Sequence, residues 1–256
     1  MLFGFDQSTW LLTFIRLGSL LAVMPFLPTQ QLPPQLRVSM AAMLAFLLAP
    51  GLPPMDAASL PWLGLVRLVF TEVSIGLLLG FVCRLIFHGL EIAGGLLATE
   101  TGLNAATIFN PLQSTPTPVT TMILHWLGMM LWLTLDLHHW MITALRRSYD
   151  LIPMGGGHLN EGLWLEMVAR TGALFGIGLQ IAAPVVATGF LVTLIFSLLG
   201  RAVPQMNSFT ESFSVRLMVG LTVFGLSVRF MSEHIINYLR RLPEDFLKIA
   251  GLLGGA

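Results

Sequence analysis

The residues best suited to chemistry are a carboxylate and two imidazoles at the end of an apolar stretch. Asp136, His138 and His139 all carry metal-ligand atoms, and Asp136 and His139 share a helix face with His125, about three turns earlier. No cysteine, no second close histidine pair and no H-E-x-x-H motif accompanies them. We therefore favour a hydrogen-bonded cluster at a helix end over metal ligation, and we expect no metal site.

Motifs that would indicate an enzyme are missing from the sequence. It contains no G-x-S-x-G elbow, no Walker A loop and no S-x-x-K nucleophile. The one cysteine, Cys83, lies in an apolar stretch, which excludes an internal disulfide and a cysteine-based metal cluster. We expect neither catalysis nor a bound cofactor.

Composition indicates which elements must position these residues. Of 256 residues, 55% are hydrophobic and only 10% are charged, and the mean hydropathy is +0.81. Soluble domains carry roughly a quarter charged residues. These values predict an integral membrane protein, all-α, with residues 1–256 in a single membrane-embedded domain. Because the formal net charge is zero and no basic run occurs, nucleic acid is not an expected partner.

Apolar stretches of unequal length follow one another along the chain: Trp10–Leu27, Val38–Leu48, Trp62–Ala98, Val119–Thr143, Leu163–Leu199 and Phe213–Met231. The second is too short to span a bilayer, and the fourth is the clearest single span. The third and fifth exceed one bilayer, so each either bends into a helical hairpin or projects as one long helix. Gly94-Gly95 and Pro184 mark possible bends.

The two ends of the chain also carry signals. The first residues lack the basic region of a signal peptide, so we expect the first apolar stretch to insert uncleaved. At the other end, residues of about 235–256 alternate Leu242, Phe246 and Ile249 with charged side chains. This pattern predicts a short interfacial helix.

Ionisable residues occur in nearly every apolar stretch: Arg16, Arg67, Glu72, Arg84, Glu91, His125, Asp136, Glu166, Arg170, Arg216 and Arg229. A charge at the centre of a bilayer costs about 2.5–3.5 kcal/mol, so these side chains must face protein, water or headgroups. Internal salt bridges, a proton or ion relay, and contacts with other subunits all remain open. The unequal span lengths favour a hetero-oligomer, in which neighbouring subunits replace lipid.

One stripe of these residues recurs at every fourth position: Glu72, Gly76, Gly80, Arg84 and His88. The two glycines form a G-x-x-x-G pair, which lets another backbone approach between a carboxylate and a guanidinium. Gly172 and Gly176 repeat the pattern beside Arg170. We expect these positions to form subunit-packing contacts.

Residues Gly102–Pro118 interrupt the apolar helices with a segment that carries no charge. Three prolines and Asn110 cannot all lie inside one helix, so we expect the chain to leave its helix near Thr101 and to restart near Val119. Loops of this length are uncommon and often functional. The segment is either a loop packed in a narrow, protein-lined space or an ordinary connector at a membrane face.

Four segments carry a resemblance: EVSIGLLLGF at 72–81, AGGLLATETGLNAATIFNP at 93–111, LDLHH at 135–139 and RAVPQMNSF at 201–209. The last is the most specific, and its matching residues are Arg201, Pro204, Gln205, Asn207 and Phe209. Together these segments resemble the FliR/SctT family, the single-copy membrane component of the type III secretion export gate. The resemblance covers essentially the whole chain.

The resemblance implies a helical hetero-oligomer in the bacterial inner membrane, within the basal body of the secretion apparatus. FliP-like and FliQ-like membrane proteins and a FlhB-like switch protein are the implied partners, and unfolded polypeptides are the implied substrates. Family members contribute a loop that plugs the closed pore. The matching residues in this sequence are Gly102, Leu103, Asn104, Ala105, Ala106, Thr107, Ile108, Phe109, Asn110 and Pro111.

The sequence departs from the family pattern at several positions. Glu100 replaces the usual glutamine, Asp136-Leu137 replaces Asn-Gly, and residues 211–216 replace a common G-F-P-L-K. The P-Q-M-N form favours a flagellar protein over the equivalent injectisome component. A small-molecule or ion transporter, using a Glu72–Arg84 pair, is the alternative of a different class.

Overall fold

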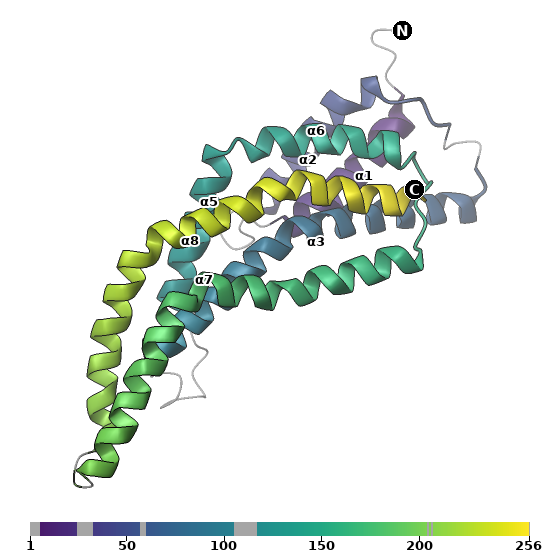
Figure 1. Cartoon of the computed structure of the whole chain (residues 1–256). Helices are drawn as coiled ribbons and strands as arrows, with labels where there is room; N and C mark the ends of the chain where they lie inside the picture. The colour runs from purple at the N-terminus through teal and green to yellow at the C-terminus, as the bar shows by residue number, and fades with distance from the viewer. Residues whose placement is uncertain are drawn as a thin grey trace. The chain divides into compact units, whose positions relative to one another are not determined.

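The computed structural model describes residues 6–24, 33–56, 60–104, 117–203, 205 and 207–255, with only the backbone at 208–210. Every regular element in these ranges is helical, which confirms the predicted all-α class. The elements are α1 (Gln7–Val23), α2 (Pro34–Leu48), the short 3₁₀ helix η1 (Ala49–Gly51), α3 (Trp62–Glu100), α5 (Val119–Thr134), α6 (Leu137–Leu151), α7 (Glu161–Ala202) and α8 (Ser208–Gly254) (Figure 1).

Both overlong apolar stretches form continuous helices. The 39 residues of α3 and the 42 residues of α7 correspond to about 59 Å and about 63 Å of helix. Gly94 and Gly95 do not interrupt α3, and Pro184 lies inside α7. The sequence allowed either a helical hairpin or one long helix for each stretch. Both stretches form one long helix.

The predicted single span over Val119–Thr143 is interrupted instead. Asp136 adopts a φ of 53°, in the left-handed region, so that α5 ends at Thr134 and α6 begins at Leu137. A side chain in this conformation cannot continue a right-handed helix. The predicted span Val119–Thr143 is therefore broken between two helices, although the pair together still passes as one broken span.

Three described helices are long and apolar enough to cross a membrane, namely α3, α7 and α8, and the pair α5 and α6 would make a fourth as a broken span. By contrast, α2 has 15 residues, about 22 Å of helix, against a hydrocarbon core of about 30 Å. The prediction that this segment is too short to span alone is confirmed.

The chain divides into two compact units. The first unit comprises residues 1–85, 136–170 and 240–256 and contains α1, α2 and α6 with parts of α3, α7 and α8. Its buried apolar core draws on all of these helices: Leu17, Leu20, Ala41, Ile75, Leu79, Met141, Leu145, Leu163, Phe246 and Ile249.

The tail of the chain is part of this core. Residues 235–254 continue α8 rather than forming a separate short helix. Leu242, Phe246 and Ile249, which the sequence places on the apolar face, are at most 4% exposed. The structure thus gives this face a protein partner, where the sequence predicted a membrane interface.

The second unit comprises residues 86–135 and 171–239. Within it, α7 and α8 form a helical hairpin (Figure 1). The Tyr238 hydroxyl donates to Oε1 of Gln180 at 2.7 Å, and Nη2 of Arg216 donates to Oγ1 of Thr193 at 2.6 Å. These two bonds join the arms of the hairpin at separate levels.

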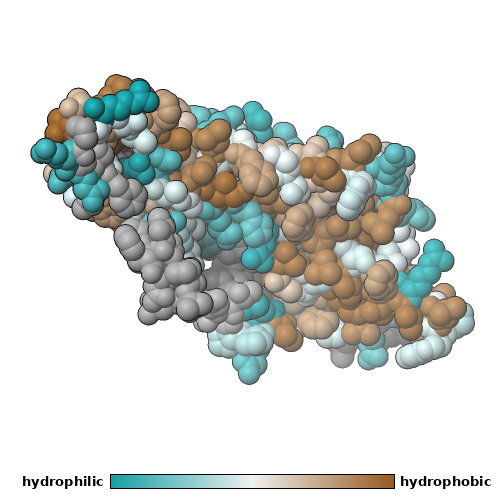
Figure 2. All heavy atoms as spheres, turned by 90° about the horizontal axis from the view of Figure 1, so that it is seen from below, coloured by the Kyte–Doolittle hydropathy of each residue, from teal (hydrophilic) through white to brown (hydrophobic). Residues whose placement is uncertain are grey.

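Large apolar side chains remain exposed on both long arms of this hairpin and on α3. Figure 2 shows hydrophobic residues over much of the face in view. Large apolar side chains with more than half of their surface exposed occur on all three helices: Trp62, Leu63, Phe70, Trp164, Leu165, Val168, Phe175, Leu179, Phe190, Leu191, Ile195, Leu198, Met218 and Leu226. Such surfaces mark contact with lipid or with other protein chains.

Candidate functional site

The predicted loop begins and restarts where the sequence places its boundaries. The helix α3 ends at Glu100, and α5 begins at Val119 after Pro118. Gly102 has a φ of 78°, and its N–H donates to the Thr99 carbonyl at 3.2 Å. A glycine in this conformation is a common helix terminator because it has no Cβ. The residues from Ala105 to Pro111 lie outside the described residues.

The first end of the loop is packed against the α7–α8 hairpin. A Cβ on Gly189 of α7 would overlap Oε2 of Glu100, and one on Gly220 of α8 would lie 2.8 Å from Cγ2 of Thr101. Thr101 is fully buried. Both arms of the hairpin therefore use a glycine to approach the end of α3 and the residue that follows it.

Gly102 also lies close to α8, at a different position of that helix. A Cβ on Gly102 would lie 2.8 Å from Cε2 of Phe213 in α8. Two features therefore favour glycine at this position: the positive φ and the close approach of the aromatic ring. We call Glu100, Thr101 and Gly102 with Phe213 the loop base.

The second end of the loop is held by α3. Oγ1 of Thr120 donates to the Gly94 carbonyl at 2.7 Å, and Thr120 is 1% exposed. A Cβ on Gly94 would overlap Cα of Thr121. Gly94, predicted as a possible bend, is instead the position where the backbone of α5 contacts α3.

Both ends of the uncharged segment are therefore attached to the second unit. The twelve residues 105–116 run between these ends and include no Asp, Glu, Lys or Arg. Past the loop base, Leu103 is 40% exposed.

The predicted packing stripe on α3 finds its partner within the chain. A Cβ on Gly76 would overlap the Arg16 carbonyl, and one on Gly80 would lie 2.7 Å from the Leu20 carbonyl, both in α1. The expected close helix approach is present. However, α1 occupies this face, which corrects the interpretation of Gly76 and Gly80 as contacts with another subunit.

Glu72 also has a different partner from the one predicted. Its carboxylate accepts from Nε of Arg16 at 2.5 Å and from Nη2 at 3.0 Å, and both side chains are fully buried. The Gly155 N–H donates to the same carboxylate at 2.9 Å. The Glu72–Arg84 pair expected of a transporter is therefore absent from the described contacts, because Arg16 takes the carboxylate.

Arg16 lies at the centre of this buried cluster, and the sequence did not indicate its partner. Its guanidinium donates to the Ile152 carbonyl at 3.2 Å and lies 4.0 Å from the centre of the Tyr149 ring. Only its position near the middle of an apolar stretch marked it in the sequence. The buried pair joins α1, α3 and the segment after α6.

Charged residues of the fifth apolar stretch form internal ion pairs, which is one of the explanations that the sequence left open. Arg170 pairs with Glu166 and with Asp245, each at 2.8 Å, and Lys248 pairs with Glu166 at 2.9 Å. These pairs join α7 to the end of α8 inside the first unit. Internal salt bridges thus account for part of the charge in the apolar stretches.

Gly172 and Gly176 have open surroundings. A Cβ added at either position would meet no atom within 4 Å. These glycines therefore have no close neighbour among the described residues of this chain. Their assignment as subunit contacts stays a prediction.

The motif of residues 201–209 connects the two arms of the hairpin. Arg201 lies in the last turn of α7, and Gln205 is exposed. The Asn207 carbonyl accepts from the Glu211 N–H at 3.1 Å at the start of α8. Pro204 and the side chain of Phe209 lie outside the described residues. The described residues of the motif thus end α7 and begin α8.

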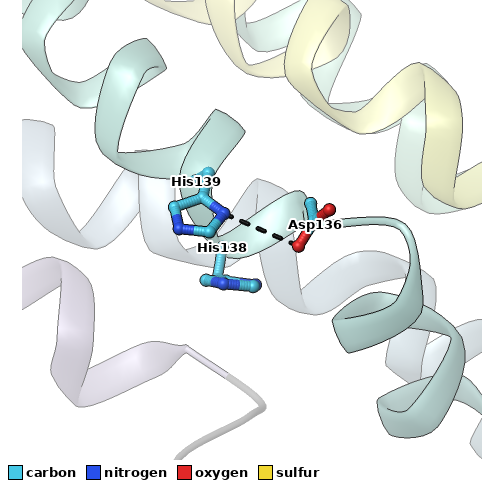
Figure 3. Close-up of side chains that lie close together, drawn as sticks. All are labelled: Asp136, His138 and His139. Carbon is cyan, nitrogen blue, oxygen red and sulfur yellow. Dashed lines mark ion pairs between the residues drawn. The ribbon is translucent and has the colours of Figure 1, made fainter.

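The Asp136, His138 and His139 group lies at the start of α6 (Figure 3). Nδ1 of His139 is 3.6 Å from Oδ1 of Asp136, and both side chains are 70% exposed. The Asp136 carbonyl accepts from the His139 N–H at 3.0 Å, while its carboxylate caps no N–H of the helix. The ligand atoms lie within 4.8 Å of one another, but their exposure and backbone geometry fit a helix start.

These features define a helical membrane protein that holds an uncharged loop by both ends. Comparison with known families gives its particular class. Residues 7–242 match the family described as bacterial export proteins, family 1, and the chain belongs to this family.

Individual relatives share nearly the full length. The chain is 32% identical to the flagellar biosynthetic protein FliR of Caulobacter vibrioides over 241 residues, covering 92% of this chain and 94% of the relative. It is 28% identical to FliR of Escherichia coli K12, covering 91% and 90%. With FliR of Bacillus subtilis it shares 25% identity, covering 96% and 95%. These similarities confirm the resemblance to the FliR/SctT family and favour its flagellar branch.

Proposed function

We propose that this chain is a component of the flagellar type III protein export gate and helps to form and close its pore. Its family and its relatives, named as flagellar biosynthetic proteins, support this assignment. Unfolded flagellar proteins are the proposed substrates. The chain acts by structure and carries out no catalysis.

The observation that carries the proposal is the attachment of the loop. Glu100, Thr101 and Gly102 pack on the α7–α8 hairpin, and Thr120 bonds to Gly94 of α3. The residues between these ends carry no charge, so the segment can enter a narrow, protein-lined pore without burying an unpaired charge. Ile108 and Phe109 supply apolar side chains for such a plug.

The exposed helix faces support the proposed partners and membrane location. The long apolar arms of α7 and α8, together with the open positions Gly172 and Gly176, support packing against other small membrane proteins. FliP-like and FliQ-like subunits, with a FlhB-like switch protein, are the proposed partners. The inner membrane within the flagellar basal body is the proposed location.

The transporter alternative loses its main support. Its relay needed Glu72 and Arg84 to face each other, whereas Glu72 is fully buried in a bidentate contact with Arg16. An injectisome role has no specific observation in its favour, since the relatives named above are flagellar. The export-gate function is therefore the better interpretation.

Deletion of residues 108–115 tests the plug. The deletion should leave the assembled gate permeable to ions, measured as salt sensitivity of growth and as ion flux into proteoliposomes that contain the purified gate. A Gly/Ser segment of equal length is the matched variant, because it keeps the chain length and removes Ile108 and Phe109. Unchanged ion flux in an intact complex would contradict the plug assignment.

A second measurement tests the wider function. Loss of the whole chain should abolish secretion of flagellar proteins, and re-expression of the chain should restore it. Normal secretion without the chain would contradict the export-gate assignment itself.

A further inference from the structure

Asp136, His138 and His139 bring three metal-ligand atoms together at the start of α6 (Figure 3). Each residue offers one such atom, and the three atoms lie within 4.8 Å of one another. All three residues belong to the first unit. The sequence favoured a hydrogen-bonded cluster without a metal at this position, so the bonds that these side chains make decide between the two interpretations.

Hydrogen bonds at this helix start are made by the backbone. The Asp136 carbonyl accepts from the N–H groups of His139 at 3.0 Å and Trp140 at 3.4 Å. The side chains make no hydrogen bond with one another: Nδ1 of His139 lies 3.6 Å from Oδ1 of Asp136, beyond the usual range of about 2.7–3.2 Å. The Asp136 carboxylate also caps no N–H of α6. The helix start therefore accounts for the backbone and leaves the side chains unexplained.

His138 adds a nitrogen without a partner. Its Nδ1 is buried and has no hydrogen bond with any residue that the structure describes. Its ring lies beside that of His139, with the ring centres 4.0 Å apart. A buried polar atom of this kind is unfavourable, because it has lost water without gaining a protein partner. A cation coordinated through this nitrogen would supply the missing interaction.

The separation of Asp136 and His139 suits two ligands of one ion. In tetrahedral sites Zn²⁺ lies about 2.0–2.2 Å from imidazole nitrogens and carboxylate oxygens, which places two such ligand atoms about 3.4 Å apart. The observed distance is 3.6 Å. We propose that Asp136, His138 and His139 bind a divalent transition-metal ion such as Zn²⁺.

The donor set indicates the class of ion. Two imidazoles with one carboxylate suit Zn²⁺ and similar transition metals, whereas Ca²⁺ and Mg²⁺ prefer oxygen ligands. Three protein ligands leave a further position for water. A bound ion would join Asp136, which has a φ of 53°, to the first turn of α6 and so stabilise this helix start. The inference does not rest on the proposed function, because metal binding by the chain is measured without export.

A proton is the competing cation. Protonated His139 would form an ion pair with Asp136 and neutralise its charge without a metal. This pair would leave Nδ1 of His138 without a partner, and it would give the chain no dependence on added metal. The response to Zn²⁺ therefore distinguishes the two.

Metal titration of the full chain tests the site. The chain is purified in detergent with a tag that contains no histidine, stripped with a chelating resin and titrated with Zn²⁺ by calorimetry. We expect one saturable ion per chain. His138→Ala, His139→Ala and Asp136→Asn should each weaken the Zn²⁺ affinity about tenfold or more. Asn tolerates the left-handed conformation as Asp does, so Asp136→Asn keeps the backbone.

His234→Ala is the matched control. His234 is a partly exposed histidine of α8, and its Nδ1 lies 3.1 Å from the Phe230 carbonyl. Its replacement should leave the Zn²⁺ affinity unchanged. Thermal unfolding gives a second measurement: Zn²⁺ should raise the midpoint of the natural chain and of His234→Ala, but not that of Asp136→Asn, because an ion that binds only the folded state stabilises it.

Three results would overturn the proposal. One is the absence of saturable Zn²⁺ binding by the natural chain. Another is binding that the three ligand variants leave unchanged, which would show an adventitious ion only. The third is an equal rise in the unfolding midpoint of Asp136→Asn and the natural chain. The proposed function is tested separately by secretion without the chain, so the failure of one proposal is distinguishable from the failure of the other.

Discussion

Arg16 and Glu72 lie 56 residues apart in the sequence and form a fully buried, bidentate pair between α1 and α3. The Ile152 carbonyl and the Gly155 N–H complete the hydrogen bonding of the two side chains. A buried charge pair is costly to break, because removal of one partner leaves the other uncompensated. The pair therefore makes the packing of three chain segments interdependent.

Replacement of Glu72 by Gln should destabilise the chain by about 3–5 kcal/mol, since the Arg16 charge then lacks its counterion. The double variant Arg16→Met with Glu72→Met should recover part of this loss. Full recovery is not expected, because the Gly155 N–H and the Ile152 carbonyl lose their partners. Unfolding in mixed detergent micelles measures all three proteins. Equal stability of Glu72→Gln and the natural chain would contradict the importance of the pair.

Gly76→Ala should destabilise the chain by about 1–3 kcal/mol, because the new methyl group would overlap the Arg16 carbonyl and the Ser19 hydroxyl in α1. Gly95→Ala in the same helix is the control, since its Cβ would meet nothing within 4 Å. That control should be neutral or up to about 1 kcal/mol stabilising, through helix propensity. Unfolding of the isolated chain, without partners, distinguishes this internal contact from a contact between subunits. Equal effects of the two variants would contradict the α1–α3 approach.

Gly102→Ala should weaken the loop base and increase ion leakage through the gate. The positive φ of 78° costs an alanine about 1–2 kcal/mol, and its Cβ would also contact the Phe213 ring. Combining it with Phe213→Ala should remove the contact but keep the backbone cost. Ion flux in proteoliposomes measures the leak, and co-purification reports assembly. Gly95→Ala, with open space around its Cβ and no assigned contact with another subunit, serves as the control.

Asp6 predicts a pH dependence of stability. Hydrogen bonds from the Thr9 and Ser8 hydroxyls to its carboxylate lower the pKa of Asp6 to about 2, and the Thr9 and Met55 N–H groups add to this. Because the pKa is lower in the folded state, the stabilisation is complete above about pH 4 and is lost as the pH falls towards 2. Asp6→Asn keeps an N-cap and should flatten this part of the curve.

Thermal unfolding between pH 2 and pH 6 tests this dependence, with a shift of a few degrees expected for the loss of one cap. The difference between the natural chain and Asp6→Asn should shrink as the pH approaches 2. A difference that grows towards low pH would have the wrong sign and would contradict the role of the Asp6 carboxylate.

The sequence by itself determined the helical membrane class, the limits of the loop and the family. Low charge and long apolar stretches leave no other fold class, and the prolines around the loop together with Gly102 force the chain out of a helix near Thr101 and back near Val119. These are local effects of residue type. They need no knowledge of what lies nearby in space.

Only the tertiary structure decided which groups meet. A G-x-x-x-G pair indicates that some backbone approaches, but it does not identify the helix, and here α1 occupies the place assigned to another subunit. Likewise, the sequence allowed several arginines as partners of Glu72. The packing of α1 against α3 places Arg16, and not Arg84, against its carboxylate. Asp136 in the left-handed region ended a stretch that looked continuous, because apolar composition does not report a single backbone angle. Pairing across long sequence separations depends on the whole packed arrangement, which local propensity does not encode.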